Sequence, residues 1–368
     1  MRVRHASEIK FFLSIDNDEP GDVYLSGTFN EWNPNDPDYR MIKLGEGNYF
    51  LTLHEADKFS FPLYYKYTRG SWGSTVQDEY DNQNRVIPLF TPRISDRLTG
   101  LADSIAAFKK SPFYPHIETV DDHFPMNSLA KTRRIRILLP HDYYTSNRVY
   151  RTLYLQDGQN LWDKSAPFGT WGIDESLTIM ASEGKDDLVI VAIDHGDKAR
   201  IQEYTPVQGT KLGVAQGRRY LKFIADELKP YIEGKYRVSG KRIDNGIGGS
   251  SMGGLISTYA ALLYPELFSK LLIFSPSLWV TQDVFKELKT VPFFKDMDIY
   301  LYGGGHESAT LVKNLKRFQN LLEQRGLKEN DIRLKLSINP LGVHNEAAWG
   351  KEFPTAIQWL YFMAHKKQ

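Results

Sequence analysis

The first part of the chain consists of short apolar runs with the period of β-strands. Aromatic and β-branched residues gather in five segments that turn-forming residues separate, namely EIKFFLSI (8–15), DVYLSGTF (22–29), NYFLTLH (48–54), FPLYYKYT (61–68) and NRVIPLF (84–90). Short strands at this spacing are typical of a small all-β fold. We therefore predict an immunoglobulin-like β-sandwich over residues 1–92.

The hydrophobic period changes after this segment. A candidate N-cap at Ser95 precedes apolar residues at steps of three or four, which are Leu98, Leu101, Ile105 and Phe108. They predict a short helix within a linker of residues 93–114. Over residues 115–368, helical patterns alternate with the strand candidates IRILLP, RTLYLQD, LVIVAID, NGIGGSS, KLLIFSP, DIYLYGG and IRLKLSI. This alternation favours an α/β domain with a mostly parallel sheet and helices on both faces.

Composition narrows the classes of function. Lys and Arg number 46 against 45 Asp and Glu, for a net charge of +1, which favours neither nucleic acid nor a membrane as partner. Cysteine is absent, which excludes disulfides and thiolate chemistry. The charged first ten residues lack the apolar core of a secretory signal. We therefore expect a cytoplasmic protein, or a secreted or periplasmic one if a signal has been removed. The sequence gives no indication of the oligomeric state.

One pentapeptide carries the strongest chemical signal. Gly249-Ser250-Ser251-Met252-Gly253 follows a strand candidate and opens a helical pattern, as the Gly-x-Ser-x-Gly turn of a nucleophilic serine requires. The glycines allow a tight, strained turn, and the helix start offers the N–H of Met252 to an oxyanion. The alternative is an ordinary glycine-rich turn. A second oxyanion donor is expected at the N–H of Gln159, after the strand RTLYLQD.

A serine nucleophile needs a base, and in this fold the base follows the acid along the chain. His344 lies in a loop after the last strand candidate, whereas His365 lies in a charged tail. Glu307 ends the glycine-rich segment DIYLYGGGHES and is the predicted orienting acid. Its alternatives are His306, a loop residue, and Asp298, at the opposite end of that strand.

Other residues are weaker candidates for substrate binding. Arg200 and Glu203 follow the strand LVIVAID, and a structural salt bridge is an equal alternative for this pair. Trp279, Trp162 and Trp171 are candidates to line the pocket, and a place in the hydrophobic core is an equal alternative for each. The same alternative holds for Trp349. Metal-ligand motifs are missing from the sequence, so we expect neither a metal nor another cofactor.

Six segments resemble one known group. YLQDGQNLWD, WGIDESL, AIDHG with ARIQEYTP, GGSSMGGLIS, the glycine-rich loop with Glu307, and GVHNEAAWGKEFP occur in the order found in an esterase family of α/β hydrolases. That family includes the esterase D, feruloyl esterase and enterochelin esterase branches. The resemblance implies an α/β-hydrolase domain over 115–368 with Ser251, Glu307 and His344 as triad and Met252 at the oxyanion position. Several branches carry aspartate as the acid.

The first domain resembles a carbohydrate-binding module of the starch- or glycogen-binding type, through VYLSGTFNEWNP, YYKYTRGSW and DNQNRVI. Trp32, Trp72 and Tyr80 would form a platform for a sugar ring. The alternatives are that these aromatics cover the sandwich core or that the domain covers the active site.

These observations predict a serine carboxylic-ester hydrolase that acts on a small-molecule or oligosaccharide ester, such as an acetyl or feruloyl ester of a carbohydrate. An enterochelin-type siderophore esterase is the alternative. An alternative of another class is a glycan-binding protein with an inactive hydrolase scaffold. Thioester hydrolysis and acyl transfer would use the same residues.

Overall fold

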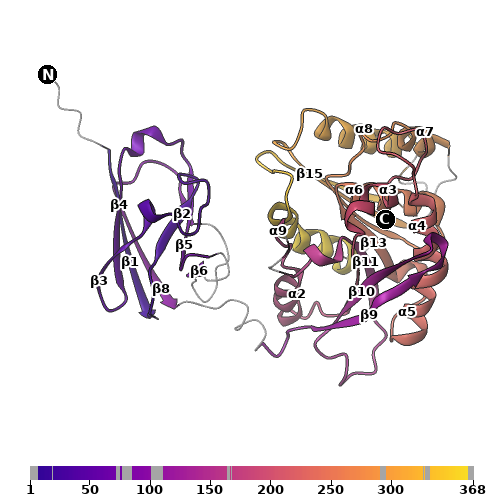
Figure 1. The fold of residues 1–368 in the computed structure, drawn as a ribbon, viewed down its shortest axis with the longest axis horizontal. Coiled ribbons are helices and arrows are strands. Elements are labelled where there is room, and N and C mark those ends of the chain that lie inside the picture. Colours follow the sequence, from indigo (N-terminus) through magenta and orange to yellow (C-terminus); the bar gives the residue numbers. More distant parts are fainter. Residues whose placement is uncertain are drawn as a thin grey trace. The chain divides into compact units, whose positions relative to one another are not determined.

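The chain folds into two units. The computed structural model describes residues 7–363, apart from 19, 72–74, 77–84, 101–110, 164–165, 167, 291–295, 326 and 328–331. Contacts divide the chain into Met1–Ser111 and Pro112–Gln368 (Figure 1). In the described residues, one cluster of buried apolar side chains belongs to the first unit and two belong to the second.

The first unit contains two β-sheets. One has the order β3-β4-β1-β8, and the other has the order β2-β5-β6 with β7 also paired to β5. The strands are β1 (Ile9–Asn17), β2 (Tyr24–Gly27), β3 (Ile42–Gly45), β4 (Asn48–Leu53), β5 (Leu63–Thr68), β6 (Thr75–Val76), β7 (Arg85–Ile87) and β8 (Arg93–Gly100). Phe11 of the first sheet contacts Tyr65 of the second, with ring centroids 5.2 Å apart, so the core lies between the sheets.

The prediction of a helix beginning at Ser95 is wrong over residues 95–100. Residues 93–100 form β8, which pairs in parallel with β1, and Leu98 is fully buried in the first core. Leu101, Ile105 and Phe108 lie outside the described residues. The short window Ser95–Gly100 fits a strand as well as a helix, and tertiary pairing with β1 decides between them. The immunoglobulin-like character of this unit stays a prediction.

The second unit is built on an eight-stranded sheet of order β16-β15-β14-β13-β11-β12-β10-β9. Its strands are β9 (His116–Met126), β10 (Lys131–Leu139), β11 (Arg151–Gln156), β12 (Leu188–Ile193), β13 (Asn245–Ser250), β14 (Lys270–Phe274), β15 (Met297–Gly304) and β16 (Ile332–Asn339). All seven predicted strands are present, and β9 is an additional edge strand. β10 runs antiparallel to both of its neighbours, and the pairs from β12 to β16 are parallel.

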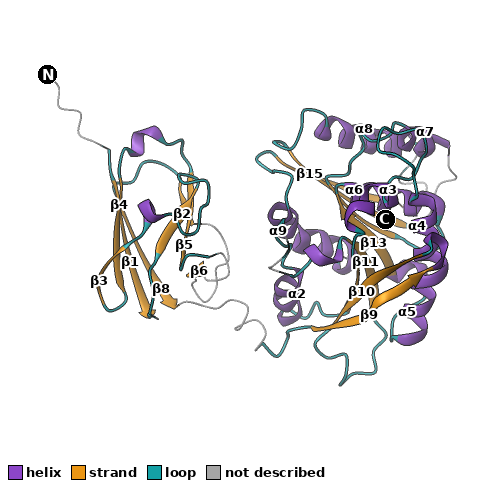
Figure 2. Ribbon diagram, in the orientation of Figure 1, coloured by secondary structure: helices purple, strands orange, loops and turns teal. Residues whose placement is uncertain are grey.

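Helices cover both faces of this sheet, as Figure 2 shows. They are α2 (Ile173–Ser182), α3 (Arg200–Glu203), α4 (Gly217–Phe223), α5 (Lys229–Lys235), α6 (Met252–Leu263), α7 (Asp283–Thr290), α8 (Leu311–Gln324) and α9 (Glu346–Ile357). Alternate strand residues separate two cores: Leu153 and Leu155 pack with α2 and α9, whereas Tyr154 packs with the helices of the opposite face. This is an α/β fold with helices on both faces of a mostly parallel sheet.

The helices in the described part of the chain are too short or too polar to cross a membrane. The parallel strands β11 to β16 instead place their carboxyl ends at one edge of the sheet, where α/β folds carry their functional groups. The loops after β11, β13, β14, β15 and β16 therefore emerge together.

Candidate active site

Ser251 lies in the tight turn between β13 and α6. Its φ of 56° and ψ of −123° are strained for a residue with a side chain. A Cβ on Gly249 would come within 3.0 Å of Gln156 Cβ, and one on Gly253 within 3.0 Å of Asp157 Oδ2. A side chain at either position would therefore require its neighbours at the end of β11 to shift. The predicted strand-turn-helix context of Ser251 is thus present.

His344 lies between Ser251 and Glu307. Its Nε2 is 3.0 Å from Ser251 Oγ, and its Nδ1 is 2.6 Å from Glu307 Oε2. The two contacts together are consistent with one tautomer, in which Nδ1–H donates to the carboxylate and Nε2 accepts from the hydroxyl. Three loops, which follow β13, β15 and β16, bring these residues together across 93 positions of sequence.

The carboxylate of Glu307 is held from several sides. Its side chain is 1% exposed, against 42% for His344. Glu307 Oε1 accepts hydrogen bonds from the N–H of Gly304 at 2.5 Å and from Ser275 Oγ at 2.7 Å, and Trp349 Nε1–H donates to Ser275 Oγ at 2.9 Å. The Trp349 ring also lies edge-on to His344, with centroids 4.9 Å apart. The sequence analysis did not anticipate Ser275, although it directly follows β14, the strand between β13 and β15.

The loops of Glu307 and His344 touch through their backbones. A Cβ on Gly342 would lie 2.8 Å from Gly304 Cα, and a Cβ on Gly305 would lie 2.3 Å from the carbonyl oxygen of Pro340. The N–H of His306 donates to the carbonyl of Gly342 at 3.0 Å. Glycine at these positions therefore sets how closely the acid and the histidine approach. His306 itself is exposed, and Asp298 is buried near the start of β15, paired with Lys270 and Arg333.

The two expected oxyanion donors lie on neighbouring strand ends. Met252 is the first residue of α6, and a helix leaves its first N–H groups without an intrahelical acceptor. Gln159 lies in the 3₁₀ turn Gly158–Asn160 after β11, the parallel neighbour of β13. The side chain of Gln159 accepts from the N–H of His195 at 2.9 Å. The roles of both backbone N–H groups stay predictions.

Arg200 and Glu203 belong to two separate ion pairs. Arg200 forms a bidentate pair with Asp157, at 2.6 Å and 2.8 Å. Burial alone would lower the pKa of Arg200, but the Asp157 charge raises it above its ordinary value. Glu203 is fully buried between Lys131 and Arg133, at 2.8 Å and 2.6 Å. Full burial between two cationic partners favours the structural salt bridge over a substrate contact for Glu203, and its role in substrate binding stays a prediction.

The predicted aromatic residues have different positions. Trp171 is a core residue, 5% exposed and stacked on Phe274 with centroids 5.4 Å apart, which favours the core alternative over a substrate contact. Trp162 is partly buried beneath the Arg136 guanidinium, whose carbon lies 4.5 Å from the ring centroid. Trp279 is 64% exposed. Trp32 is half-buried in the first unit, while Trp72, Tyr80 and His365 lie outside the described residues.

A carboxylate that the sequence analysis did not single out lies beside the triad. Glu346 begins α9 two residues after His344, and Asn160 Nδ2 donates to its Oε1 at 3.2 Å. Burial raises the pKa of Glu346, and so does the Asp157 charge, while His344 and Arg200 act in the opposite direction. Glu346 is 9% exposed. The motif HNE offered a signal, but its spacing alone could not indicate the contact with a loop 186 positions away.

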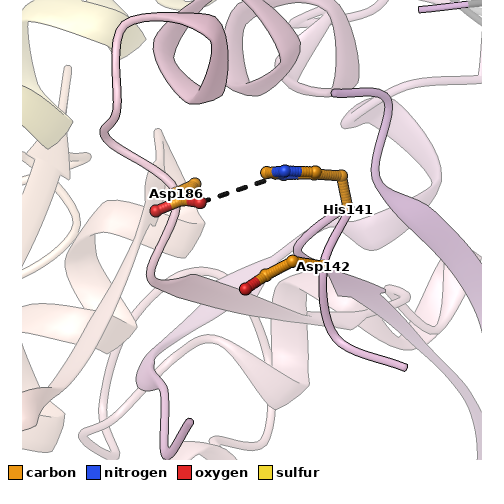
Figure 3. A group of neighbouring side chains, drawn as sticks. All are labelled: His141, Asp142 and Asp186. Atoms are coloured by element: carbon orange, nitrogen blue, oxygen red, sulfur yellow. Dashed lines mark ion pairs between the residues drawn. The ribbon is translucent and has the colours of Figure 1, made fainter. Parts of the chain in front are cut away.

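One group of side chains in the described residues has the spacing of metal ligands. The ligand atoms of His141, Asp142 and Asp186 lie within 4.8 Å of one another, and Figure 3 shows them converging, with His141 Nδ1 4.0 Å from Asp186 Oδ2. Arg148 Nη2 lies 2.9 Å from Asp142 Oδ2 and 3.1 Å from Asp186 Oδ2. The guanidinium thus supplies the positive charge that the two carboxylates require, and we interpret the group as an ion-pair network.

The fold and the serine turn at the carboxyl edge of its sheet define an α/β enzyme of the esterase type. The sequence model of the family described as "Putative esterase" matches residues 126–360, and the chain belongs to this family. The matched range contains all three residues of the hydrogen-bonded chain from Ser251 to Glu307.

Individual proteins are similar to this chain over different shares of its length. The uncharacterized protein YbbA of Bacillus subtilis is 28% identical over 245 residues, which are 63% of this chain and 94% of YbbA. The enterobactin esterase FES of Shigella flexneri, solved with enterobactin, has a similar fold with a TM-score of 0.56, at 17% identity over 98% of this chain and 95% of FES. An α-amylase of Niallia circulans is 35% identical over 86 residues, which are 22% of this chain and 6% of the amylase.

Proposed function

We propose that this chain is a serine carboxylic-ester hydrolase that works through an acyl-enzyme. The observation that carries the proposal is the pair of contacts made by His344, 3.0 Å to the hydroxyl of Ser251 and 2.6 Å to the carboxylate of Glu307. A general base within hydrogen-bond reach of a nucleophile, itself oriented by a buried acid, is the geometry that acyl transfer needs.

Each residue then has a defined step. Ser251 Oγ attacks the ester carbonyl as its proton passes to His344 Nε2, and the N–H groups of Met252 and Gln159 receive the oxyanion. The tetrahedral intermediate breaks its C–O bond to the alcohol, which takes the proton from Nε2. Water attacks the acyl-enzyme with His344 again as base, and the proton returns to Ser251 as the carboxylic acid leaves. Glu307 stays ionised and stabilises the imidazolium in both halves.

For the substrate, we propose an acyl ester of a carbohydrate, of the acetyl or feruloyl type. The similarity of 86 residues to an α-amylase supports this, because it covers a stretch of the length of an accessory module. An enterochelin-type triester is the second candidate, supported by the match of FES over 98% of this chain. At 17% identity that match concerns the fold alone, so we rank it second.

The test compares wild type with Ser251→Ala on 4-nitrophenyl acetate, methyl ferulate, an acetylated oligosaccharide and a catechol siderophore triester. We expect Ser251→Ala to lose at least about 10³-fold in kcat. A serine-directed phosphonate should add its mass to the wild type and leave the variant unmodified. The substrate with the highest kcat/KM distinguishes the two candidate substrate classes.

Ser257→Ala is the matched control, since this buried serine lies on the same helix and its hydroxyl has no hydrogen-bond partner within the described chain. It should keep wild-type activity and label normally. Folded wild-type protein that neither hydrolyses an ester nor takes the phosphonate would contradict the proposal and favour a glycan-binding protein with an inactive scaffold.

A further inference from the structure

A groove of about 900 Å³ lies along α8 of the second unit. One wall consists of Trp279 and Gln282, which follow β14, and the other consists of α8 with Thr310, Lys313, Lys316 and Arg317. Figure 1 places α8 beside α7. No step of the proposed mechanism uses any of these side chains.

The groove has a positive charge that its own walls do not neutralise. Lys313, Lys316 and Arg317 line it, and no aspartate or glutamate is among its lining residues in the described part of the chain. Arg317 is held in place, because its Nη1 donates to Gln282 Oε1 at 2.7 Å and its guanidinium carbon lies 4.0 Å from the centroid of the Phe285 ring. Neither contact removes its charge, so the groove keeps three cations for a ligand.

Trp279 gives the groove a flat apolar face. This side chain is 64% exposed, although it directly follows Leu278, which is 1% exposed. Aromatic and sugar rings are the groups that stack on an exposed indole face. The groove therefore combines a surface for a ring with positive charge for an anion.

Both walls of the groove begin, along the chain, close to residues of the proposed active site. Ser277 Oγ lies 3.3 Å from Ser251 Oγ, and the N–H of Ser277 donates to the carbonyl of Ser251 at 3.0 Å. Trp279 comes two residues after Ser277. On the other wall, Thr310 caps α8 three residues after Glu307. Since β14 and β15 are parallel neighbours, both walls begin at the edge of the sheet that carries Ser251.

We propose that this groove binds the negatively charged part of the ester substrate, a carboxylate carried by an aromatic or sugar ring that stacks on Trp279. The proposal rests on the proposed function, because it names the substrate class of that site. Lys313 and Lys316 attract the carboxylate, Arg317 fixes it, and the ester bond lies toward Ser251. The two sources of this chemistry are aryl carboxylates and acidic sugars.

The experiment uses full-length enzyme and pairs of acetate esters that differ only in charge. 4-Acetoxycinnamate is compared with 4-acetoxycinnamamide, and acetylated oligogalacturonate with its methyl-esterified counterpart. We expect wild type to prefer the carboxylate of at least one pair by about 3- to 10-fold in kcat/KM at low salt, through KM. In Lys313→Gln/Lys316→Gln the preference should fall to about 1, with the neutral partner of each pair hydrolysed as before.

Two controls isolate the groove. The variant Lys222→Gln/Lys241→Gln removes exposed lysines that do not line it and should keep the preference, and 0.5 M salt should abolish the preference in the wild type. A preference in one pair alone identifies the source of the ligand. No charge preference in either pair, or a preference that the Lys313/Lys316 variant keeps, would overturn the proposal. A failure of the proposed function gives a different result, because the Ser251→Ala variant would then still hydrolyse the neutral acetates.

Discussion

At the scale of single residues, two buried carboxylates of the site have different surroundings. Glu307 is buried and receives hydrogen bonds from Gly304 and Ser275 in addition to its contact with His344. Glu346 is buried with one amide donor, from Asn160, and lies near the negative charge of Asp157. Donors that point at a charge stabilise it, whereas burial beside a like charge favours the proton. The surroundings of Glu346 therefore favour its protonated form, whereas the carboxylate of Glu307 is held by three polar contacts.

The raised pKa of Glu346 predicts a pH-dependent effect of Glu346→Gln. The folded protein binds a proton at this site more tightly than the unfolded chain does, so ionisation destabilises the fold as pH rises above the ordinary value of 4.5. We expect Glu346→Gln to raise the melting temperature by about 1 to 3 °C at pH 8 and to leave it unchanged at pH 4. Thermal unfolding at both pH values measures this.

Glu183→Gln serves as control, because Glu183 is 54% exposed and its loss should matter little at either pH. A Glu346→Gln protein that melts below the wild type at pH 8 would show that the ionised carboxylate stabilises the fold.

At the scale of elements, much of the site could be predicted because it depends on strand ends. Ser251, Glu307 and His344 each follow an apolar strand whose pattern is visible in the sequence, and parallel strands bring such loops together. The burial of Glu203 and Trp171 could not be predicted, because the position of a residue in a motif does not reveal how deeply it is buried. The strand β8 was missed because its pairing with β1 spans about 80 positions, beyond the reach of local periodicity.

The contact between the loops after β15 and β16 predicts the effect of a single methyl group. In Gly342→Ala the new Cβ would lie 2.8 Å from Gly304 Cα and 2.9 Å from Tyr302 Oη, so the loop of His344 must shift. A displacement near 1 Å at reacting groups costs about 10²-fold in rate. We expect a loss of that order in kcat on 4-nitrophenyl acetate.

The matched control is Gly234→Ala in α5, where a Cβ meets nothing within 4 Å and activity should be retained. If Gly342→Ala stays within threefold of wild-type kcat, the glycine contact does not set the position of His344.

At the scale of the whole molecule, the two units have separate cores in the described residues. The buried clusters of the second unit contain side chains from residue 117 onward, and the family match lies within 126–360. The division into an all-β part and an α/β part followed from the change of hydrophobic period. The sequence does not reveal the function of the first unit, because sugar binding depends on which aromatic faces are exposed.

Residues 112–368 alone should therefore fold and hydrolyse 4-nitrophenyl acetate with a kcat/KM within about threefold of the full chain. Because the first unit resembles a carbohydrate-binding module, binding of a starch-type oligosaccharide, measured by calorimetry, should be lost with it. A large change in the esterase rate on removing residues 1–111 would instead indicate that the first unit covers the active site.

The order of the site residues along the chain determines when, during synthesis, the site can form. Ser251 and His344 are separated by 93 positions, and at 5 to 20 residues per second a ribosome needs about 5 to 19 s to pass from one to the other. During that interval the nascent chain carries its serine without the histidine that would activate it, and β16 is completed only just before His344. The proposed chemistry thus begins only after synthesis has passed the last strand of the sheet, so an unfinished chain should not react with esters in its surroundings.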